Sequence, residues 1–159
     1  MLGTTHLLFA ILFGSIYIKY VGAHESLFLQ IFFAATLMLG AMLPDLDSKH
    51  STISKQHPTT SKIIRIFSGH RGIMHSVFIP VGIFLIANYM LPELFGLPPE
   101  LFVGFLIGYI SHLASDIITI GGLELFHPFS SYRIRGFIRT GGKLEMIIAS
   151  LIVVYLLIF

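Results

Sequence analysis

Long apolar runs alternate with polar connections along the chain, and each run is close to the length of a membrane span. A hydrocarbon core of about 30 Å needs a helix of about 20 residues, and apolar character on all sides favours spanning helices over strands. The sequence therefore predicts an all-α fold, a polytopic membrane helix bundle made by one domain over residues 1–159. The five predicted transmembrane helices cover Thr4–Val21, Leu27–Leu43, Ile73–Leu91, Leu101–Ile120 and Leu144–Phe159.

The composition supports a membrane protein and limits its chemistry. Hydrophobic residues make up 55% of the chain and charged residues 11%, with a mean hydropathy of +0.86, whereas soluble domains carry about 25% charged residues. The N-terminus has neither a basic region nor a cleavage site of small residues, so we expect no removable signal peptide. There is no cysteine, so a metal site would have to use imidazole and carboxylate ligands.

Positive charge is concentrated in and beside the two long connections, Pro44–Gly72 and Gly121–Lys143. Nine of the ten lysines and arginines lie there, and only Lys19 lies toward the other side. Loops rich in lysine and arginine stay on the cytoplasmic side of a membrane. We therefore predict a multi-pass protein of the plasma (inner) membrane, with its N-terminus and both long loops in the cytoplasm.

His112 and Asp116 lie within the fourth predicted helix, in a run of otherwise mostly apolar side chains. Residues four apart on a helix point in the same direction, so this imidazole and this carboxylate share one face. Ionisable side chains within a membrane segment are unfavourable and commonly mark functional sites. Two ligand-type side chains on one face also make half of a metal site.

The remaining metal-ligand residues fall at the same, cytoplasmic end of the predicted helices. This follows from chain direction, because successive spans run in opposite directions and the ligand residues open some helices and close others. We therefore expect them to converge on one face of the bundle. The candidate metal ligands are His6, Asp45, Asp47, His70, His75, His112 and Asp116.

Imidazole and carboxylate ligands favour zinc, with manganese or iron as alternatives. The candidates outnumber the four ligands of a closed site, which indicates one to three ions, or an ion together with a proton-transfer carboxylate. Two ions about 3.5–4 Å apart can stabilise both oxygens of a phosphoryl displacement. We expect Asp47 or Asp116 to act as general base or bridging ligand, and Arg71 to hold a phosphate with its planar guanidinium.

Each candidate also has a structural interpretation without metal. His112 and Asp116 can share a buried hydrogen bond that fixes helix packing. Asp45 and Asp47 can form an Asx turn after a helix. Also open are His6 as a helix-start residue, His70 off the shared helix face, Arg71 as an anchor to lipid phosphate, and Glu145 as a helix N-terminal charge.

Four separated motifs carry a family resemblance. They read Thr5-His6-x-x-x-Ala10, Gly40-x-x-x-Pro44-Asp45-x-Asp47-Ser48, His70-Arg71-x-x-x-His75-Ser76 and Gly108-Tyr109-x-Ser111-His112-x-x-x-Asp116-x-x-Thr119. In this order the motifs resemble those of the YdjM-like membrane-bound metal-dependent hydrolases. They are more distantly similar to zinc-dependent phospholipase C and the single-strand nucleases related to it. The resemblance implies a hydrolase whose best metal ligands are His6, Asp45, His75, His112 and Asp116.

The leading hypothesis is a membrane-embedded metal-dependent hydrolase that cleaves a phosphoester of a phospholipid or lipid-linked substrate at the cytoplasmic membrane face. Its expected partners are the bilayer and an anionic lipid, and no nucleic acid is expected. The alternative is an ion or proton transporter with an intramembrane His/Asp relay, which predicts polar residues at mid-membrane depth on several helices. A metalloprotease is disfavoured because the chain lacks His-Glu-x-x-His, and a structural scaffold is the remaining hypothesis.

Overall fold

A computed structural model describes residues 1–22, 26–47, 73–95 and 102–158, together with single residues between 54 and 62. Within this part the fold is all-α, as predicted, and it contains no β-strand. Only two isolated bridges, Thr119 with Ile138 and Leu123 with Ile134, pair backbone segments of the connection before the last helix. The helices are α1 (Gly3–Val21), α2 (Leu27–Met42), α5 (Phe78–Phe95), α6 (Val103–Ile117) and α7 (Lys143–Ile158), with short 3₁₀ helices η1 (Leu43–Asp47) and η2 (Ile73–His75).

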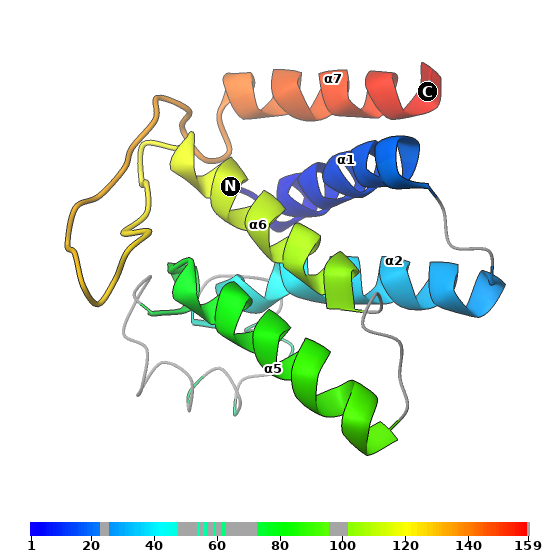
Figure 1. Ribbon diagram of the computed structural model, residues 1–159. Helices are drawn as coiled ribbons and strands as arrows, with labels where there is room; N and C mark the ends of the chain where they lie inside the picture. The colour runs from blue at the N-terminus through cyan, green and yellow to red at the C-terminus, as the bar shows by residue number, and fades with distance from the viewer. Residues whose placement is uncertain are drawn as a thin grey trace.

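The helices alternate in direction, so the ends that carry the ligand residues gather on one side of the molecule (Figure 1). Helix α6 crosses α2 and α1 diagonally, α7 lies beside α1, and α5 packs on α6. The N-terminal ends of α1, α5 and α7 and the C-terminal ends of α2 and α6 all lie at the left of this view. The predicted convergence of these ends is therefore present in the described part of the fold.

Helices α2 and α6 make the closest contact, and glycines allow it. A Cβ atom on Gly108 would lie 2.0 Å from the carbonyl oxygen of Leu37, and one on Gly40 would lie 2.2 Å from that of Phe105. Gly104, one turn before Gly108, faces α2 in the same way. Small residues four apart are a common way for membrane helices to bring their backbones together. Here they bring the ligand-bearing half of α6 against the end of α2.

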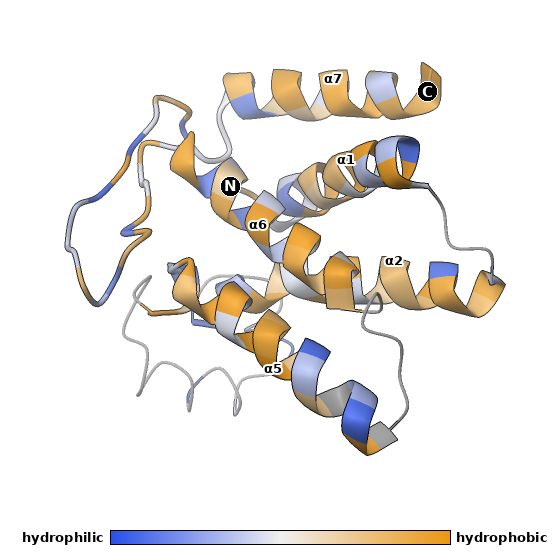
Figure 2. Ribbon diagram, in the orientation of Figure 1, coloured by the Kyte–Doolittle hydropathy of each residue, from blue (hydrophilic) through white to orange (hydrophobic). Residues whose placement is uncertain are grey.

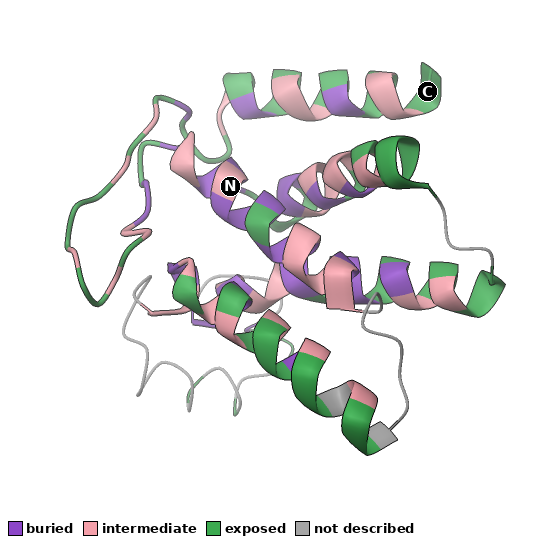
Figure 3. Cartoon of the chain, viewed as in Figure 1, coloured by how far each residue is buried: buried purple, intermediate pink, exposed green. Residues whose placement is uncertain are grey.

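The inward faces of the helices are buried and the outward faces are apolar. Ala10, Phe33, Leu37 and Ala41 form a buried cluster between α1 and α2, and the burial pattern follows the inner faces of the helices (Figure 3). The outer faces remain strongly hydrophobic (Figure 2), with Leu39, for example, 58% exposed. Extended apolar surfaces of this kind indicate contact with a nonaqueous partner, which a bilayer provides.

Two segments, Gly3–Val21 and Leu27–Asp47, have the length and apolar composition needed to cross a membrane. Phe78–Leu94 and Val103–Ile117 are apolar but shorter. By this criterion the structure supports two spans among the described residues, and the five predicted spans stay a prediction.

Three predicted helix boundaries differ clearly from the structure, and at two of them tertiary contacts compete with the helix. The third long helix begins at Phe78 rather than at residue 73, since His75 belongs to a 3₁₀ turn and the amide of Val77 donates to the carbonyl of Leu125 at 2.9 Å. It also continues through Pro92 to Phe95. Helix α6 ends at Ile117, three residues early, because the following backbone pairs with Ile138.

We expect Gly108→Ala to lower the melting temperature of the detergent-purified protein. The added methyl group meets the backbone of α2, so the two helices must separate, and such overpacking costs about 1–3 kcal/mol or more. The matched control is Gly82→Ala in α5, where a Cβ meets no described atom within 4 Å and alanine is the better helix former by about 1 kcal/mol. An unchanged melting temperature for Gly108→Ala would contradict the close α2–α6 contact.

Candidate metal centre

Two groups of metal-ligand side chains meet where the ends of α1, α2 and α6 come together. One consists of His6, Asp45 and His112, and the other of His75, His112 and Asp116; within each group the ligand atoms lie within 4.8 Å of one another. Because His112 belongs to both, the five side chains form a single His–Asp cluster. Asp45 is half-buried and the other four are almost fully buried.

His112 occupies the middle of the His–Asp cluster, and the α2–α6 contact orients it. Its Nδ1 lies 2.7 Å from the carbonyl oxygen of Ala41, which can only accept, so the ring hydrogen is assigned to Nδ1. The lone pair is then on Nε2, which faces Oδ2 of Asp116 at 4.0 Å. The His6 ring stacks on the His112 ring with centroids 3.8 Å apart and an interplanar angle of 12°, which holds both planes.

His6 is oriented in the same way by a hydroxyl group. Its Nδ1 lies 2.7 Å from Oγ of Ser115, and that hydroxyl donates its own hydrogen to the carbonyl of His112 at 2.7 Å. The serine oxygen therefore accepts from Nδ1 of His6. This assigns the lone pair of His6 to Nε2, which lies 3.4 Å from Oδ1 of Asp116.

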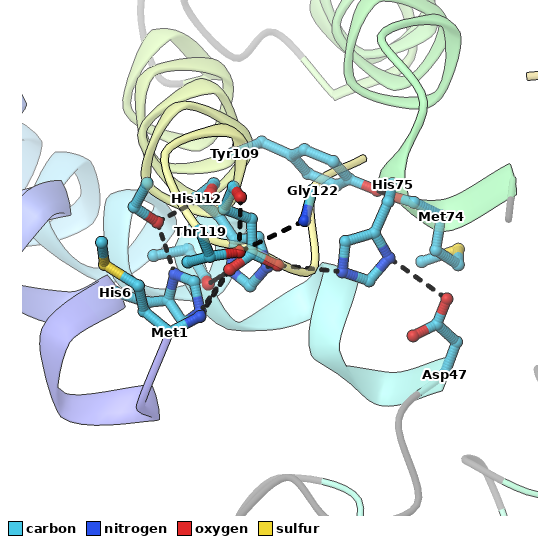
Figure 4. A network of polar contacts seen from close by, with 12 residues as sticks. Met1, His6, Asp47, Met74, His75, Tyr109, His112, Thr119 and Gly122 are labelled. Atoms are coloured by element: carbon cyan, nitrogen blue, oxygen red, sulfur yellow. Dashed lines mark hydrogen bonds and ion pairs between the residues drawn. The ribbon is translucent and has the colours of Figure 1, made fainter. Parts of the chain in front are cut away.

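His75 completes the set from the 3₁₀ helix η2. Its Nδ1 lies 3.2 Å from Oδ2 of Asp47, and its Nε2 faces Oδ2 of Asp116 at 3.9 Å. The ring therefore lies between these two carboxylates, and Figure 4 shows its contact with Asp47. The hydroxyl of Tyr109 donates to the carbonyl of Met74, which ties η2 to α6 and holds His75 over the cluster.

The arrangement fits a divalent metal ion. The three Nε2 atoms lie 3.4, 3.9 and 4.0 Å from the Asp116 carboxylate, and two ligands of a tetrahedral zinc ion are about 3.4 Å apart. Among the described residues, Nε2 of His75 and Nε2 of His112 have no hydrogen-bond partner, although a buried polar atom left so costs about 1–3 kcal/mol. The two imidazoles and one carboxylate of the group His75, His112 and Asp116 are a donor set that zinc accepts.

A small cavity reaches the cluster between the start of α1 and the end of α2. It has a volume of about 110 Å³, which is room for several water molecules. His6 and Asp45 both line it, so these two side chains face its interior. The remaining lining residues are Gly3, Thr4, Leu7, Ala41 and Met42.

Three of the predicted site residues are not among the five side chains of the His–Asp cluster. Asp47 lies outside both ligand groups and contacts the far nitrogen of His75. A carboxylate in that place can fix the tautomer and orientation of a ligating histidine, and the metal-ligand role of Asp47 stays a prediction. His70 and Arg71 lie outside the described residues, and their roles stay predictions.

Sequence reasoning missed the groups that orient the imidazoles. Ser115 lies three residues after His112 on the same helix, a spacing that could have identified it as a neighbour on one face. The Ala41 carbonyl has no sequence signal, because every residue carries one. Tyr109 belongs to the motif that contains His112, but nothing in the sequence indicates its contact with Met74.

Glu145 does more than place a negative charge at a helix N-terminus. It is 1% exposed and accepts hydrogen bonds from the amide of Leu2 at 2.6 Å and from that of Gly141 at 2.7 Å. The amino group of Met1 in turn lies 2.5 Å from Oδ1 of Asp116. Glu145 therefore links the start of α7 to the start of α1, next to the His–Asp cluster.

We expect Glu145→Ala to lower the melting temperature and to speed amide exchange in residues 1–22. Hydrogen bonds to a charged group contribute about 1.5–3 kcal/mol each, and this carboxylate accepts two. Glu93→Ala, which removes an exposed carboxylate in α5, is the control and should change neither quantity. Equal exchange in both variants would show that Glu145 does not hold the start of α1.

Comparison with known proteins places the chain in a family. The model of the YdjM inner membrane protein family matches residues 1–159. The chain is similar to "Uncharacterized protein YvsG" of Bacillus subtilis (strain 168), with 29% identity over 150 residues that cover 93% of this chain and 87% of the relative.

The "Inner membrane protein YdjM" of Escherichia coli (strain K12) and that of Shigella flexneri are each 31% identical over 91 residues, which cover 57% of this chain and 46% of theirs. None of these names states a reaction, and no solved structure matches the chain. Since the family model matches throughout residues 1–159, the chain belongs to the YdjM inner membrane protein family.

Proposed function

We propose that the protein is a membrane-embedded hydrolase that depends on a divalent metal and cleaves a phosphoester of a phospholipid or lipid-linked substrate. One observation carries the proposal: three imidazole Nε2 atoms from separate elements face one buried carboxylate at 3.4–4.0 Å. In a purely structural cluster, each buried Nε2 atom would be expected to have a hydrogen-bond partner. The Nε2 atoms of His75 and His112 have none among the described residues.

His75, His112 and Asp116 would hold one ion, most naturally zinc, and His6 and Asp45, which form the second group with His112, would supply a further ligand or the group that takes a proton. A divalent ion there would supply Lewis acidity, which polarises a phosphoryl oxygen and favours ionisation of water near neutral pH. Asp45 suits proton transfer because it is half-buried and lines the cavity. This moves the general-base role away from Asp47, which is engaged with His75.

The placement of ionisable groups favours hydrolysis over transport. Among the described residues, the buried carboxylates and imidazoles all lie at the ligand-bearing end of the helices. A relay across the membrane would need such groups at successive depths along several helices. A centre at one end suits a reaction at one membrane face.

The charge around the cluster suits an anionic lipid substrate. Arg135, Arg139 and Lys143 are exposed in the segment that connects α6 to α7, on the same side of the molecule as the ligand-bearing helix ends. Basic residues near a membrane surface attract anionic head groups. Membership of an inner membrane protein family places the chain at a bilayer, and we propose that both long loops are cytoplasmic.

The test of the proposal is metal content. Protein purified in detergent should contain at least about one zinc, manganese or iron ion per chain by mass spectrometry of metals. His112→Gln should lose this metal, since His112 belongs to both ligand groups. His127→Gln is the matched control, because His127 is half-exposed and pairs with Glu124 at 3.7 Å, outside the cluster.

The same proteins test the reaction. Wild type and His127→Gln should release phosphate or a phosphorylated head group from phosphatidylglycerol vesicles or from lipid pyrophosphates, and His112→Gln should not. Retention of metal by the combined His75→Ala, His112→Ala and Asp116→Ala variant would overturn the proposed centre. Size-exclusion profiles and circular dichroism would establish that each variant is folded.

Asp47→Asn should weaken metal binding without abolishing it. The amide keeps the shape of the carboxylate but loses its charge, so Nδ1 of His75 is held less firmly. Partners of this kind typically change metal affinity about 10–100-fold. Competition with a chelator measures the change, and an Asp47→Asn protein as devoid of metal as His112→Gln would show instead that Asp47 is itself a ligand.

A further inference from the structure

A second cavity runs along the contact between α1 and α2. It has a volume of about 450 Å³ and a mostly apolar lining. Ala34 contributes little side-chain volume there, whereas the side chain of Leu37 lies against Gly14, 2.7 Å from the place of a Cβ atom. The α1–α2 groove, as we call it, is lined by Ile11, Gly14, Ser15, Tyr17 and Ile18 of α1 and by Gln30, Phe33, Ala34, Leu37 and Met38 of α2.

The groove and the small cavity at the His–Asp cluster lie about one helix turn apart along the contact between α1 and α2. On α1 the lining residues Leu7, Ile11, Gly14 and Ile18 follow one another at spacings of three or four, which places them on one helix face. On α2 the corresponding series is Met42, Met38, Ala34 and Gln30. The α1–α2 groove therefore ends about one turn along both helices from the small cavity that His6 and Asp45 line.

The combined length of the α1–α2 groove and the small cavity matches one hydrocarbon chain. From Leu7 to Ile18 a helix rises about 17 Å, close to the roughly 15 Å of one leaflet of a bilayer. The lining of the groove is mostly apolar, as the binding of a hydrocarbon chain requires.

We propose that the α1–α2 groove binds one acyl chain of the lipid substrate and thereby places the phosphoester of its head group in the small cavity beside His6 and Asp45. This inference rests on the proposed function and names how that site selects its substrate. The lipid reaches the buried cluster sideways from the leaflet, and the protein distinguishes it from soluble phosphoesters by its chain.

Photo-crosslinking tests the groove without requiring catalysis. The protein is placed in phosphatidylglycerol nanodiscs that contain a small fraction of phosphatidylglycerol with a diazirine in the middle of one chain, and the adducts are mapped by mass spectrometry. We expect adducts to concentrate on groove residues such as Ile11 and Met38. Equal labelling of Leu39 and Leu151, which are exposed outside the groove, would mean ordinary bilayer contact and overturn the inference.

Two neighbouring alanines provide a matched pair of variants. Ala34 lines the groove and Ala35 does not, although both are exposed on α2. Ala34→Trp should reduce groove adducts at least about tenfold, because an indole fills the space of the chain, and Ala35→Trp should leave them unchanged.

Failure of this inference and failure of the proposed function are distinguishable. Metal binding and hydrolysis with adducts spread over all outer faces would remove only the acyl-chain site. Groove adducts in a protein without metal or hydrolysis would remove the proposed reaction and leave a lipid-binding groove. In an active protein, Ala34→Trp should raise the KM for phosphatidylglycerol, with Ala35→Trp as the unchanged control.

Discussion

The close contact between α2 and α6 is the constraint on which the rest of the site depends. Gly40 and Gly108 leave no room for a Cβ atom between the two backbones, and membrane helices associate largely through such packing. Only because the backbones are this close can Nδ1 of His112 reach the carbonyl of Ala41 at 2.7 Å. That single hydrogen bond sets the tautomer of the central imidazole and aims Nε2 at Asp116.

The other two imidazoles repeat the same arrangement with different acceptors. Ser115 holds His6 and Asp47 holds His75, so all three rings present Nε2 to one carboxylate. Leaving buried nitrogen atoms without hydrogen-bond partners is unfavourable, and a protein that maintains such an arrangement commonly does so for function. Orienting partners of this kind adjust metal affinity as well as geometry. The proposed metal centre thus includes its supporting groups.

The position of the cluster relates the proposed chemistry to the membrane. It lies at one end of the helices, beside a basic connection, and the α1–α2 groove lies about one helix turn from the small cavity at the cluster. A lipid substrate can therefore place its chain among apolar side chains and its charged head group among ligands and basic residues. Residues of α1 and α2 line both the groove and the small cavity, so binding of the chain and placement of the phosphoester would be geometrically linked.

Much of this was determined by the sequence alone. The long apolar runs are local features of the sequence, and they predicted the five helices and their alternating directions. From these directions followed the gathering of the metal-ligand residues at one end, namely His6, Asp45, His75, His112 and Asp116. Tertiary structure decided what depends on neighbours distant in the chain: the placement of Asp47 against His75, the hydroxyl of Ser115, the carbonyl of Ala41, and the late start of α5. These choices arise from how backbones approach and which donors meet which acceptors, and no spacing within a single segment encodes them.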